Sequence, residues 1–232
     1  MSETNQIPAV SPVKEPSSFR LISALAIAGL FSGILLATTY SLTLPRIQAN
    51  KEAALKNAIF AVLPGSADYI ILKRSGDTLE EVRLGAGDNQ NEEEIVYAGY
   101  NTMKELTGFA IPGEEPGFQD IIGVIVGYDP VLRSIIGFEV LESKETPGLG
   151  DKIFKDMDFQ QNFTMLKVEP EILVVKKGQK TRDNEVEAIT GATISSKAVV
   201  VLLNKSMGAW VSVIDNYMKK NDIKLAGHGA KK

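Results

Sequence analysis

The sequence contains no cysteine and only one histidine in 232 residues. Without cysteine the chain cannot form a disulfide, bind zinc or an iron–sulfur cluster through thiolates, or use a thiol as a nucleophile. His228 stands alone in a Gly- and Lys-rich C-terminal segment, so neither a Ser-His-Asp triad nor a multi-histidine metal site is expected. Chemistry must therefore depend on carboxylates, hydroxyls, lysine, tyrosine or a bound group.

Strong positive charge is also missing. The formal net charge is -4 at pH 7, and no stretch gathers lysine and arginine into a basic stripe. A nucleic-acid partner is therefore not expected, because proteins that bind nucleic acids attract the phosphates with clustered positive charge. The length suits one ordinary domain with an attachment.

Charge of either sign is absent from the run between Leu21 and Leu44, which is 24 residues long. A helix needs about 20 apolar residues to cross the hydrocarbon core of a bilayer, whereas the apolar part of a signal peptide has only about 7–15. The sequence therefore predicts one transmembrane helix over 21–44, in contact with membrane lipid, after a disordered cytoplasmic tail over 1–20. A buried core helix is the alternative.

The remaining sequence predicts a domain over 45–222 and a short C-terminal tail over 223–232. Apolar residues recur at three-, four- and seven-residue steps between Arg46 and Leu63, which indicates a helix that continues from the membrane span. Residues 85–93 form a polar loop. Five short runs rich in β-branched and aromatic residues predict strands: Tyr69–Lys73, Glu94–Ala98, Ile121–Tyr128, Ser134–Leu141 and Glu171–Lys176.

A second helix is predicted late in the chain, where apolar residues step by four and three positions and mark one buried face. These residues are Leu203, Met207, Trp210, Ile214 and Tyr217. The expected fold class is therefore α+β, a small twisted β-sheet with flanking helices, preceded by one N-terminal transmembrane helix.

The segment Thr190-Gly191-Ala192-Thr193 opens this late helix. Gly191 and Ala192 have almost no side chain, so another molecule can approach the backbone closely. The Thr193 hydroxyl lies beside the first free N–H groups of a helix, where a phosphate would meet the positive end of the helix dipole. In the alternative interpretation, Thr190 or Thr193 is an ordinary helix N-cap.

A loop with the sequence Glu145-Thr146-Pro147-Gly148-Leu149-Gly150 follows a strongly apolar strand. Pro147 fixes φ, and Gly148 and Gly150 permit positive φ, so a sharply bent loop of defined shape is expected. Its backbone suits a wall against a flat ligand, and Leu149 is the one apolar side chain that it offers. An ordinary strand-to-helix turn is the alternative.

The two segments and the single N-terminal span together resemble the FMN-binding subunit family. This family includes the G subunit of the Rnf ion-translocating electron transport complex and the C subunit of the sodium-pumping NADH:quinone oxidoreductase. The resemblance covers essentially the whole soluble part of the chain, and it is closer to the compact Rnf G subunit.

The resemblance implies a role for each of these residues. It implies that the FMN phosphate is esterified to the hydroxyl of Thr193, and that Thr190, Gly191 and Ala192 complete the recognition segment. It also implies that the loop from Glu145 to Gly150 lies near the flavin ring. A phosphoester suits this chain, because ring-linked flavins usually need histidine, cysteine or tyrosine.

Two positions depart from the family pattern. The acidic residue ahead of the Thr-Gly-Ala-Thr segment is usually aspartate, and here it is Glu187. Histidine often stands two residues before the glutamate of the loop, and here that position is Ser143.

The resemblance further implies a membrane-anchored electron-transfer subunit with covalent FMN in a ferredoxin:NAD oxidoreductase complex, with no catalytic acid or base of its own. Its partners would be the other membrane subunits of the complex, and a separate flavin transferase would attach the FMN. The FMN domain would lie on the periplasmic or extracellular side of the inner (plasma) membrane. Charge alone does not decide this orientation, because a positive residue flanks each end of the span, Arg20 before it and Arg46 after it.

Two alternatives remain open. The first is the C subunit of the related quinone oxidoreductase or another anchored FMN-binding electron carrier. The second is a membrane-anchored binding or scaffold protein without a cofactor.

Overall fold

The computed structural model describes residues 17–82, 94–223 and 225–226. The polar loop expected over 85–93 lies outside these residues, as do residues 1–16 of the expected N-terminal tail. The chain divides into two compact units, Met1–Lys51 and Glu52–Lys232, which are described one at a time.

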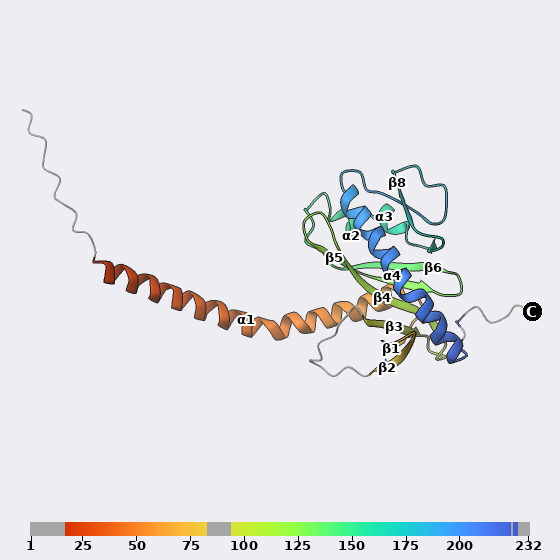
Figure 1. Cartoon of the computed structure of the whole chain (residues 1–232), viewed down its shortest axis with the longest axis horizontal. Coiled ribbons are helices and arrows are strands. Elements are labelled where there is room, and N and C mark those ends of the chain that lie inside the picture. The colour runs from red at the N-terminus through yellow and green to blue at the C-terminus, as the bar shows by residue number, and fades with distance from the viewer. Residues whose placement is uncertain (1–16, 83–93, 224, 227–232) are drawn as a thin grey trace, which may run out of the picture. The chain divides into compact units, whose positions relative to one another are not determined.

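The first unit contains most of helix α1, which begins at Ser18 and ends at Val62 (Figure 1). Residues 18–20 are therefore helical and not part of a tail, because the Ser17 carbonyl accepts the first hydrogen bonds of the helix. The apolar run 21–44 lies wholly within α1, and its large side chains are exposed, as Leu25 and Leu36 at 74% show. Such a surface is suited to lipid, and α1 is long and apolar enough to cross a membrane.

The second unit is built on a seven-stranded antiparallel sheet with the order β2-β1-β3-β4-β5-β6-β7. From β3 onward each strand pairs with the next one along the chain. The strands are β1 (Asp68–Ser75), β2 (Thr78–Val82), β3 (Ile95–Tyr100), β4 (Leu106–Pro116), β5 (Ile121–Asp129), β6 (Ser134–Glu142) and β7 (Leu166–Lys167).

Three helices and a small parallel sheet complete this unit. They are α2 (Lys152–Lys155), α3 (Met157–Gln161), α4 (Thr193–Lys220), β8 (Leu173–Val175) and β9 (Glu185–Glu187). The pairing of β9 with β8 brings the chain to the start of α4 through the short connection 188–192.

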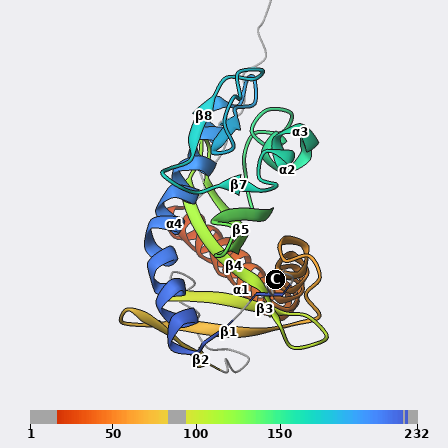
Figure 2. The ribbon, with the colours of Figure 1, turned by 90° about the vertical axis from the view of Figure 1, so that its right-hand side faces the viewer.

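Both faces of the large sheet are covered. Successive residues of a strand point to opposite faces. In β5, Val124 and Val126 belong to the core cluster that includes the buried face of α4, whereas Ile125 joins a second cluster with Ile59 and Val62 at the end of α1. Figure 2 shows α4 running along one face of the sheet. The sheet therefore lies between α4 and the last turns of α1 and provides a firm base for the α4 N-terminus.

The expected α+β class is confirmed, and the five predicted runs overlap β1, β3, β5, β6 and β8. The predicted apolar stripe of the last helix is buried, from Leu203 to Tyr217. The sequence does not predict β4, a central strand, because Gly108, Pro112 and Gly113 interrupt its apolar pattern with residues typical of turns.

The C-terminal tail expected from residue 223 is only partly correct. Leu225 is 5% exposed and forms a β-bridge with Leu106, and the Ala226 N–H donates to the Leu106 carbonyl at 2.7 Å. The domain therefore extends to at least residue 226, because Leu225 packs into the core and this segment pairs with the start of β4.

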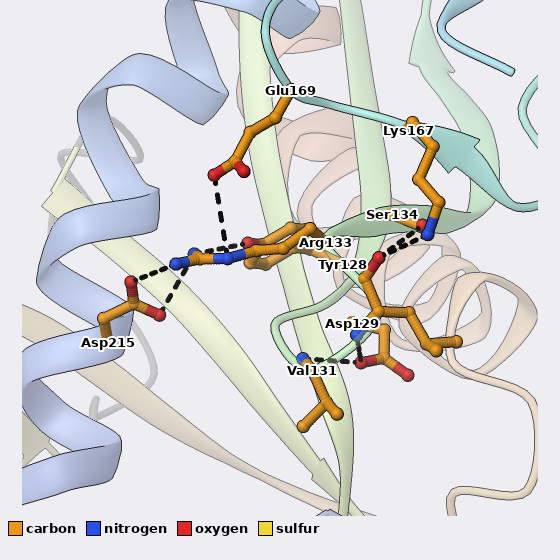
Figure 3. A network of polar contacts seen from close by, with 9 residues as sticks. Tyr128, Asp129, Val131, Arg133, Ser134, Lys167, Glu169 and Asp215 are labelled. Atoms are coloured by element: carbon orange, nitrogen blue, oxygen red, sulfur yellow. Dashed lines mark hydrogen bonds and ion pairs between the residues drawn. The ribbon is translucent and has the colours of Figure 1, made fainter. Parts of the chain in front are cut away.

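Arg133 joins the turn between β5 and β6 to helix α4 (Figure 3). Its guanidinium donates two hydrogen bonds to the Asp215 carboxylate, at 3.2 and 2.8 Å, and one to the Tyr128 hydroxyl at 3.2 Å. The Glu169 carboxylate lies 3.6 Å from its Nε. The backbone of Arg133 has φ 52°, a left-handed conformation that is unfavourable for a residue with a Cβ. These contacts therefore stabilise a turn that carries backbone strain.

Replacing Arg133 provides a test of this turn. We expect Arg133→Ala to lower the free energy of unfolding by about 1–2 kcal/mol, because it removes charge-assisted hydrogen bonds to a partly exposed carboxylate. Arg133→Gly should be less harmful by roughly 0.5–1 kcal/mol, since glycine adopts the left-handed conformation without a Cβ penalty. Thermal or denaturant unfolding of the full chain in detergent measures both, and equal losses would contradict a strained backbone at Arg133.

Candidate functional site

The two segments singled out in the sequence lie together at the N-terminal end of α4. A Cβ placed on Gly191 would lie 3.7 Å from Cδ2 of Leu149. The Ser195 hydroxyl, in the first turn of α4, donates a 2.6 Å hydrogen bond to Oε2 of Glu145. The loop 145–150 therefore lies beside the Thr-Gly-Ala-Thr segment, although more than forty positions separate Leu149 from Gly191 along the chain.

Glu145 is the polar centre of this arrangement. Its other oxygen, Oε1, accepts hydrogen bonds from the N–H groups of Phe118 at 2.8 Å and Gln119 at 3.0 Å. The residue is only 5% exposed. Burial acts to raise the pKa of its carboxyl, but the hydrogen bonds from Gln119, Ser195 and Phe118 outweigh burial and hold the pKa below its usual range. The carboxylate is therefore ionised at neutral pH.

Two glycines make room for this carboxylate. A Cβ on Gly117 would collide with Oε1 of Glu145, and a Cβ on Gly150 would collide with its Oε2. The positive φ expected for Gly148 is observed, at 78°, whereas Gly150 has no positive φ. The expected positive φ at Gly150 is therefore wrong. Glycine is required at this position because a side chain would collide with Glu145.

Hydrogen bonds also hold the rest of this loop. Thr146 donates its hydroxyl to Oε1 of Gln119 at 2.9 Å, and the Gly148 N–H donates to the Asp151 carboxylate at 2.7 Å. Pro147 and Leu149 are exposed, the latter at 50%. The loop therefore has a fixed backbone and presents Leu149 to the outside.

The N-cap alternative for Thr190 and Thr193 is not supported. The N-cap position of α4 is Ala192, which has no side-chain capping bond, and Thr193 is the first helical residue. Ser196 holds the turn instead, because its hydroxyl accepts from the Ile189 N–H at 3.0 Å and donates to the Ala192 carbonyl at 2.9 Å. Neither threonine therefore caps the helix.

The start of α4 has free hydrogen-bond donors. Among the described residues, no acceptor bonds the N–H groups of Thr193, Ile194 or Ser195, and the first turn contains no acidic residue. The Thr193 hydroxyl likewise has no hydrogen-bond partner in the described part of the chain, and Thr193 is exposed. A phosphate group has the charge and the acceptors that such a helix start lacks.

Gly191 is required by its backbone conformation. Its φ is 85°, in the left-handed region that disfavours residues with a Cβ. Ala192 is 5% exposed and packs into the core, whereas Thr190 is exposed. The four-residue segment therefore makes a sharp turn that leaves both threonines at the surface and buries the alanine between them.

The two departures from the family pattern have structural partners. Oε1 of Glu187 accepts the N–H groups of Gly178 at 3.0 Å and Lys180 at 3.1 Å, so this carboxylate holds the turn after β8. The Ser143 hydroxyl accepts the Glu145 N–H at 3.3 Å. Both side chains are half-buried and stabilise the backbone near the site.

A polar depression of about 210 Å³ lies between α2, α3 and the end of β9 and reaches Thr190. Its lining includes Lys152, Lys177 and Glu187, and Lys177 is paired with Asp158 at 3.2 Å. The depression is large enough for only part of a flavin nucleotide, and its charges suit polar groups.

Sequence reasoning missed three contributors to this site: Ser195, Ser196 and the backbone of 117–119. The two serines are buried, at 2% and 0% exposure, on a helix face that is otherwise apolar. Adjacent polar residues in a buried stripe are a detectable signal, since buried hydroxyls need partners. The link from Glu145 to Phe118 has no comparable signal, because it depends on how distant strands end.

We expect Glu145→Gln to destabilise the protein at pH 7 by an amount on the order of 1–3 kcal/mol, the usual scale for a buried charge-assisted hydrogen bond. Since the folded pKa is below the ordinary value of 4.5, the ionised carboxylate stabilises the fold above that pH, and this stabilisation is lost as pH falls through the folded pKa. The melting temperatures of wild type and variant should therefore converge in acid.

Glu114→Gln is the matched control for this prediction. Glu114 is an exposed carboxylate near the end of β4, so its replacement should change stability by less than about 0.5 kcal/mol. A constant difference between wild type and Glu145→Gln from pH 7 to pH 3 would rule out the ionised carboxylate as the source of stability.

Comparison with known proteins identifies the domain. Residues 117–208 match the FMN-binding domain family, a range that runs from the glycine beside Glu145 through most of α4. The chain is 30% identical over 183 residues to the G subunit of the proton-translocating ferredoxin:NAD(+) oxidoreductase complex of Clostridium ljungdahlii, covering 79% of this chain and 86% of that protein.

Two further relatives are also named as G subunits of ion-translocating complexes. The chain is 29% identical over 188 residues to the G subunit of the ion-translocating oxidoreductase complex of Methanosarcina acetivorans, covering 81% of this chain and 92% of that protein. It is 34% identical over 148 residues to the G subunit of the Na(+)-translocating ferredoxin:NAD(+) oxidoreductase complex of Acetobacterium woodii, covering 63% of this chain and 69% of the relative.

Solved structures show the same fold. Shewanella oneidensis NqrC superposes with a TM-score of 0.56 at 15% identity, covering 75% of this chain and 99% of NqrC. The C subunit of the Na(+)-translocating NADH-quinone reductase of Parabacteroides distasonis gives 0.57 at 20% identity, covering 72% and 95%. At this identity the likeness supports the fold alone, whereas the sequence relatives decide the family. The chain belongs to the G subunits of ion-translocating ferredoxin:NAD(+) oxidoreductase complexes, within the wider family of FMN-binding domains.

Proposed function

We propose that this chain is the membrane-anchored, FMN-carrying electron-transfer subunit of an ion-translocating ferredoxin:NAD oxidoreductase (Rnf) complex. One observation carries the proposal. Within the segment that matches the FMN-binding domain family, an exposed Thr193 hydroxyl without a partner among the described residues stands at a helix start with three free N–H groups. These donors fit a phosphate.

The residues present fit FMN in both charge and polarity. The N–H groups of Thr193, Ile194 and Ser195 would hold the phosphate, and the turn at Thr190, Gly191 and Ala192 would allow it to approach the backbone. The loop from Thr146 to Gly150 would form the wall beside the flavin ring, with Leu149 as its apolar contact.

When bound, FMN supplies one- and two-electron redox chemistry, for which the protein sets the potential through hydrogen bonds and local polarity. The chain's own task is to bind and orient the cofactor and to limit its access to water. It needs no catalytic acid or base at this site, because electron transfer breaks no bond in the protein.

We further propose that the FMN is covalent and joined through its phosphate to the Thr193 hydroxyl. The exposed hydroxyl is accessible to a separate flavin transferase, and the family pattern reaches from Glu187 to Thr193. At the position where the family usually has aspartate, the Glu187 side chain accepts hydrogen bonds from two backbone N–H groups. The structure of this chain therefore accommodates glutamate there.

The named relatives belong to complexes, so the remaining membrane subunits of the complex are the proposed partners. Helix α1 would cross the inner (plasma) membrane once, with the FMN domain on the periplasmic or extracellular side. The names of two relatives specify different ions, protons in one and Na⁺ in the other, and so do not assign a coupling ion to this chain.

Neither alternative has comparable support. The C subunit of the quinone oxidoreductase shares the fold, but the solved structures are only 15% and 20% identical to this chain. An anchored scaffold without a cofactor would not account for the match to the FMN-binding domain family. Copurification of iron–sulfur subunits after mild solubilisation separates the Rnf assignment from the quinone oxidoreductase.

Attachment is tested by coexpression with a flavin transferase. Wild type should give a fluorescent flavin band after SDS denaturation and a mass increased by one FMN residue, whereas Thr193→Ala should give neither. Thr164→Ala is the control, since it removes an exposed threonine hydroxyl of the same domain outside the recognition segment and should retain a labelled Thr193. An unmodified mass for wild type, or a modified mass for Thr193→Ala, would exclude the proposed linkage.

Leu149 is tested separately from attachment. We expect Leu149→Ala to keep covalent flavin but to change its midpoint potential or its rate of electron transfer, because a half-exposed apolar contact beside the flavin would be lost. Potentiometric titration and in-gel fluorescence provide the two measurements. Loss of attachment in this variant would instead mean that the transferase recognises the loop.

A further inference from the structure

The carboxylate of Glu145 is turned into the protein and not toward a ligand. Its two oxygens accept from the Phe118 N–H, the Gln119 N–H and the Ser195 hydroxyl, and Gly117 and Gly150 pack against it on either side. At 5% exposure, little of the residue can contact another molecule. Any effect of Glu145 on a cofactor must therefore act through the residues that it holds.

These residues belong to three segments that are distant along the chain. Phe118 and Gln119 follow β4, Glu145 follows β6, and Ser195 lies in the first turn of α4. In the described residues, the sheet pairs β4 and β6 each with β5, and the loops beyond their ends meet at this carboxylate. One side chain thus fixes the relative position of two loops and the helix start.

Each of the two loops carries an exposed apolar side chain. Phe118 is 66% exposed and Leu149 is 50% exposed, although hydrogen bonds to the buried carboxylates of Glu145 and Asp151 hold the backbone of both loops. Apolar side chains that an ordered backbone holds at the surface are available to line a site for the apolar face of a ligand.

We propose that Glu145 is the positioning residue of the flavin site, and that it holds Phe118 and Leu149 in place as two apolar walls for the flavin ring beside Thr193. This inference rests on the proposed function and extends it in two ways. Glu145 acts without touching the cofactor, and Phe118, which sequence reasoning did not select, becomes a flavin contact.

The hydrogen bonds to the Glu145 carboxylate determine which substitution of this residue preserves the arrangement. Three donors converge on one carboxylate, so glutamate satisfies all of them without a donor of its own. Glutamine keeps one acceptor oxygen for the two N–H groups, and its amide can donate to the Ser195 hydroxyl oxygen, which then acts as acceptor. Alanine removes all three bonds and leaves a space between Gly117 and Gly150.

The test uses the full chain coexpressed with a flavin transferase, and it compares wild type with Glu145→Ala, Glu145→Gln and the control Glu114→Gln. The readouts are covalent flavin by mass, visible circular dichroism of the flavin, and the anisotropy of its fluorescence. In Glu145→Ala we expect labelled protein that has lost most of its visible dichroism and has lower anisotropy, because the ring is no longer held. Glu145→Gln and Glu114→Gln should retain both signals.

Two further variants keep the test decisive. Phe118→Ala should reduce the visible dichroism as Glu145→Ala does, and Phe118→Leu should retain more of it, since an apolar wall remains. If far-ultraviolet dichroism shows that Glu145→Ala does not fold, Ser195→Ala replaces it. This variant removes only the hydrogen bond between α4 and Glu145, and we expect it to lower the flavin anisotropy in a folded protein.

The outcomes separate this inference from the proposed function. Wild-type dichroism and anisotropy in folded, labelled Glu145→Ala, or in folded Ser195→Ala where it replaces that variant, would overturn the positioning role while leaving the cofactor assignment intact. Unlabelled wild type would overturn the covalent linkage itself. Equal loss of signal in Glu145→Gln and Glu145→Ala would also contradict the inference, because the charge and not the hydrogen-bonded position would then control the ring.

Discussion

The hydrogen bonds that converge on the buried Glu145 carboxylate are the contact on which the proposed FMN site depends. Two backbone N–H groups and one serine hydroxyl meet the same side chain, and two glycines leave the space for it. A buried charge is costly unless it is fully hydrogen-bonded, so this carboxylate stabilises one arrangement of its neighbours and strongly disfavours others. The loops after β4 and β6 and the start of α4 consequently have a defined relative position.

The sheet makes that arrangement possible. Both of its faces are buried, one under α4 and the other under the end of α1, so the strands that lead into the two loops are firmly held. The ion pair of Arg133 with Asp215 attaches the opposite half of α4 to the β5–β6 turn. Helix α4 is therefore fixed near both ends, and the first two residues of its uncapped N-terminus, Thr193 and Ile194, are exposed.

Different side chains hold the backbone of the site and face a cofactor. Buried groups, namely Glu145, Ser195 and Ser196, hold the backbone, while exposed groups, namely Thr193, Leu149 and Phe118, are available to a cofactor. An electron carrier benefits from this division, because a flavin whose surroundings do not move needs little reorganisation when its charge changes.

The sequence by itself determined the long apolar N-terminal helix, the α+β class, the buried stripe of α4 and the two segments at the proposed site, because each depends on local periodicity or on a short motif. Tertiary structure alone decided that β4 is a central strand despite its glycines and proline, that Leu225 returns to the core, and that Gly150 serves packing and not a positive φ. It also decided that Glu145 faces inward to Phe118 and Ser195. Such contacts join residues far apart in the chain, and no local pattern encodes which distant donor a buried carboxylate will meet.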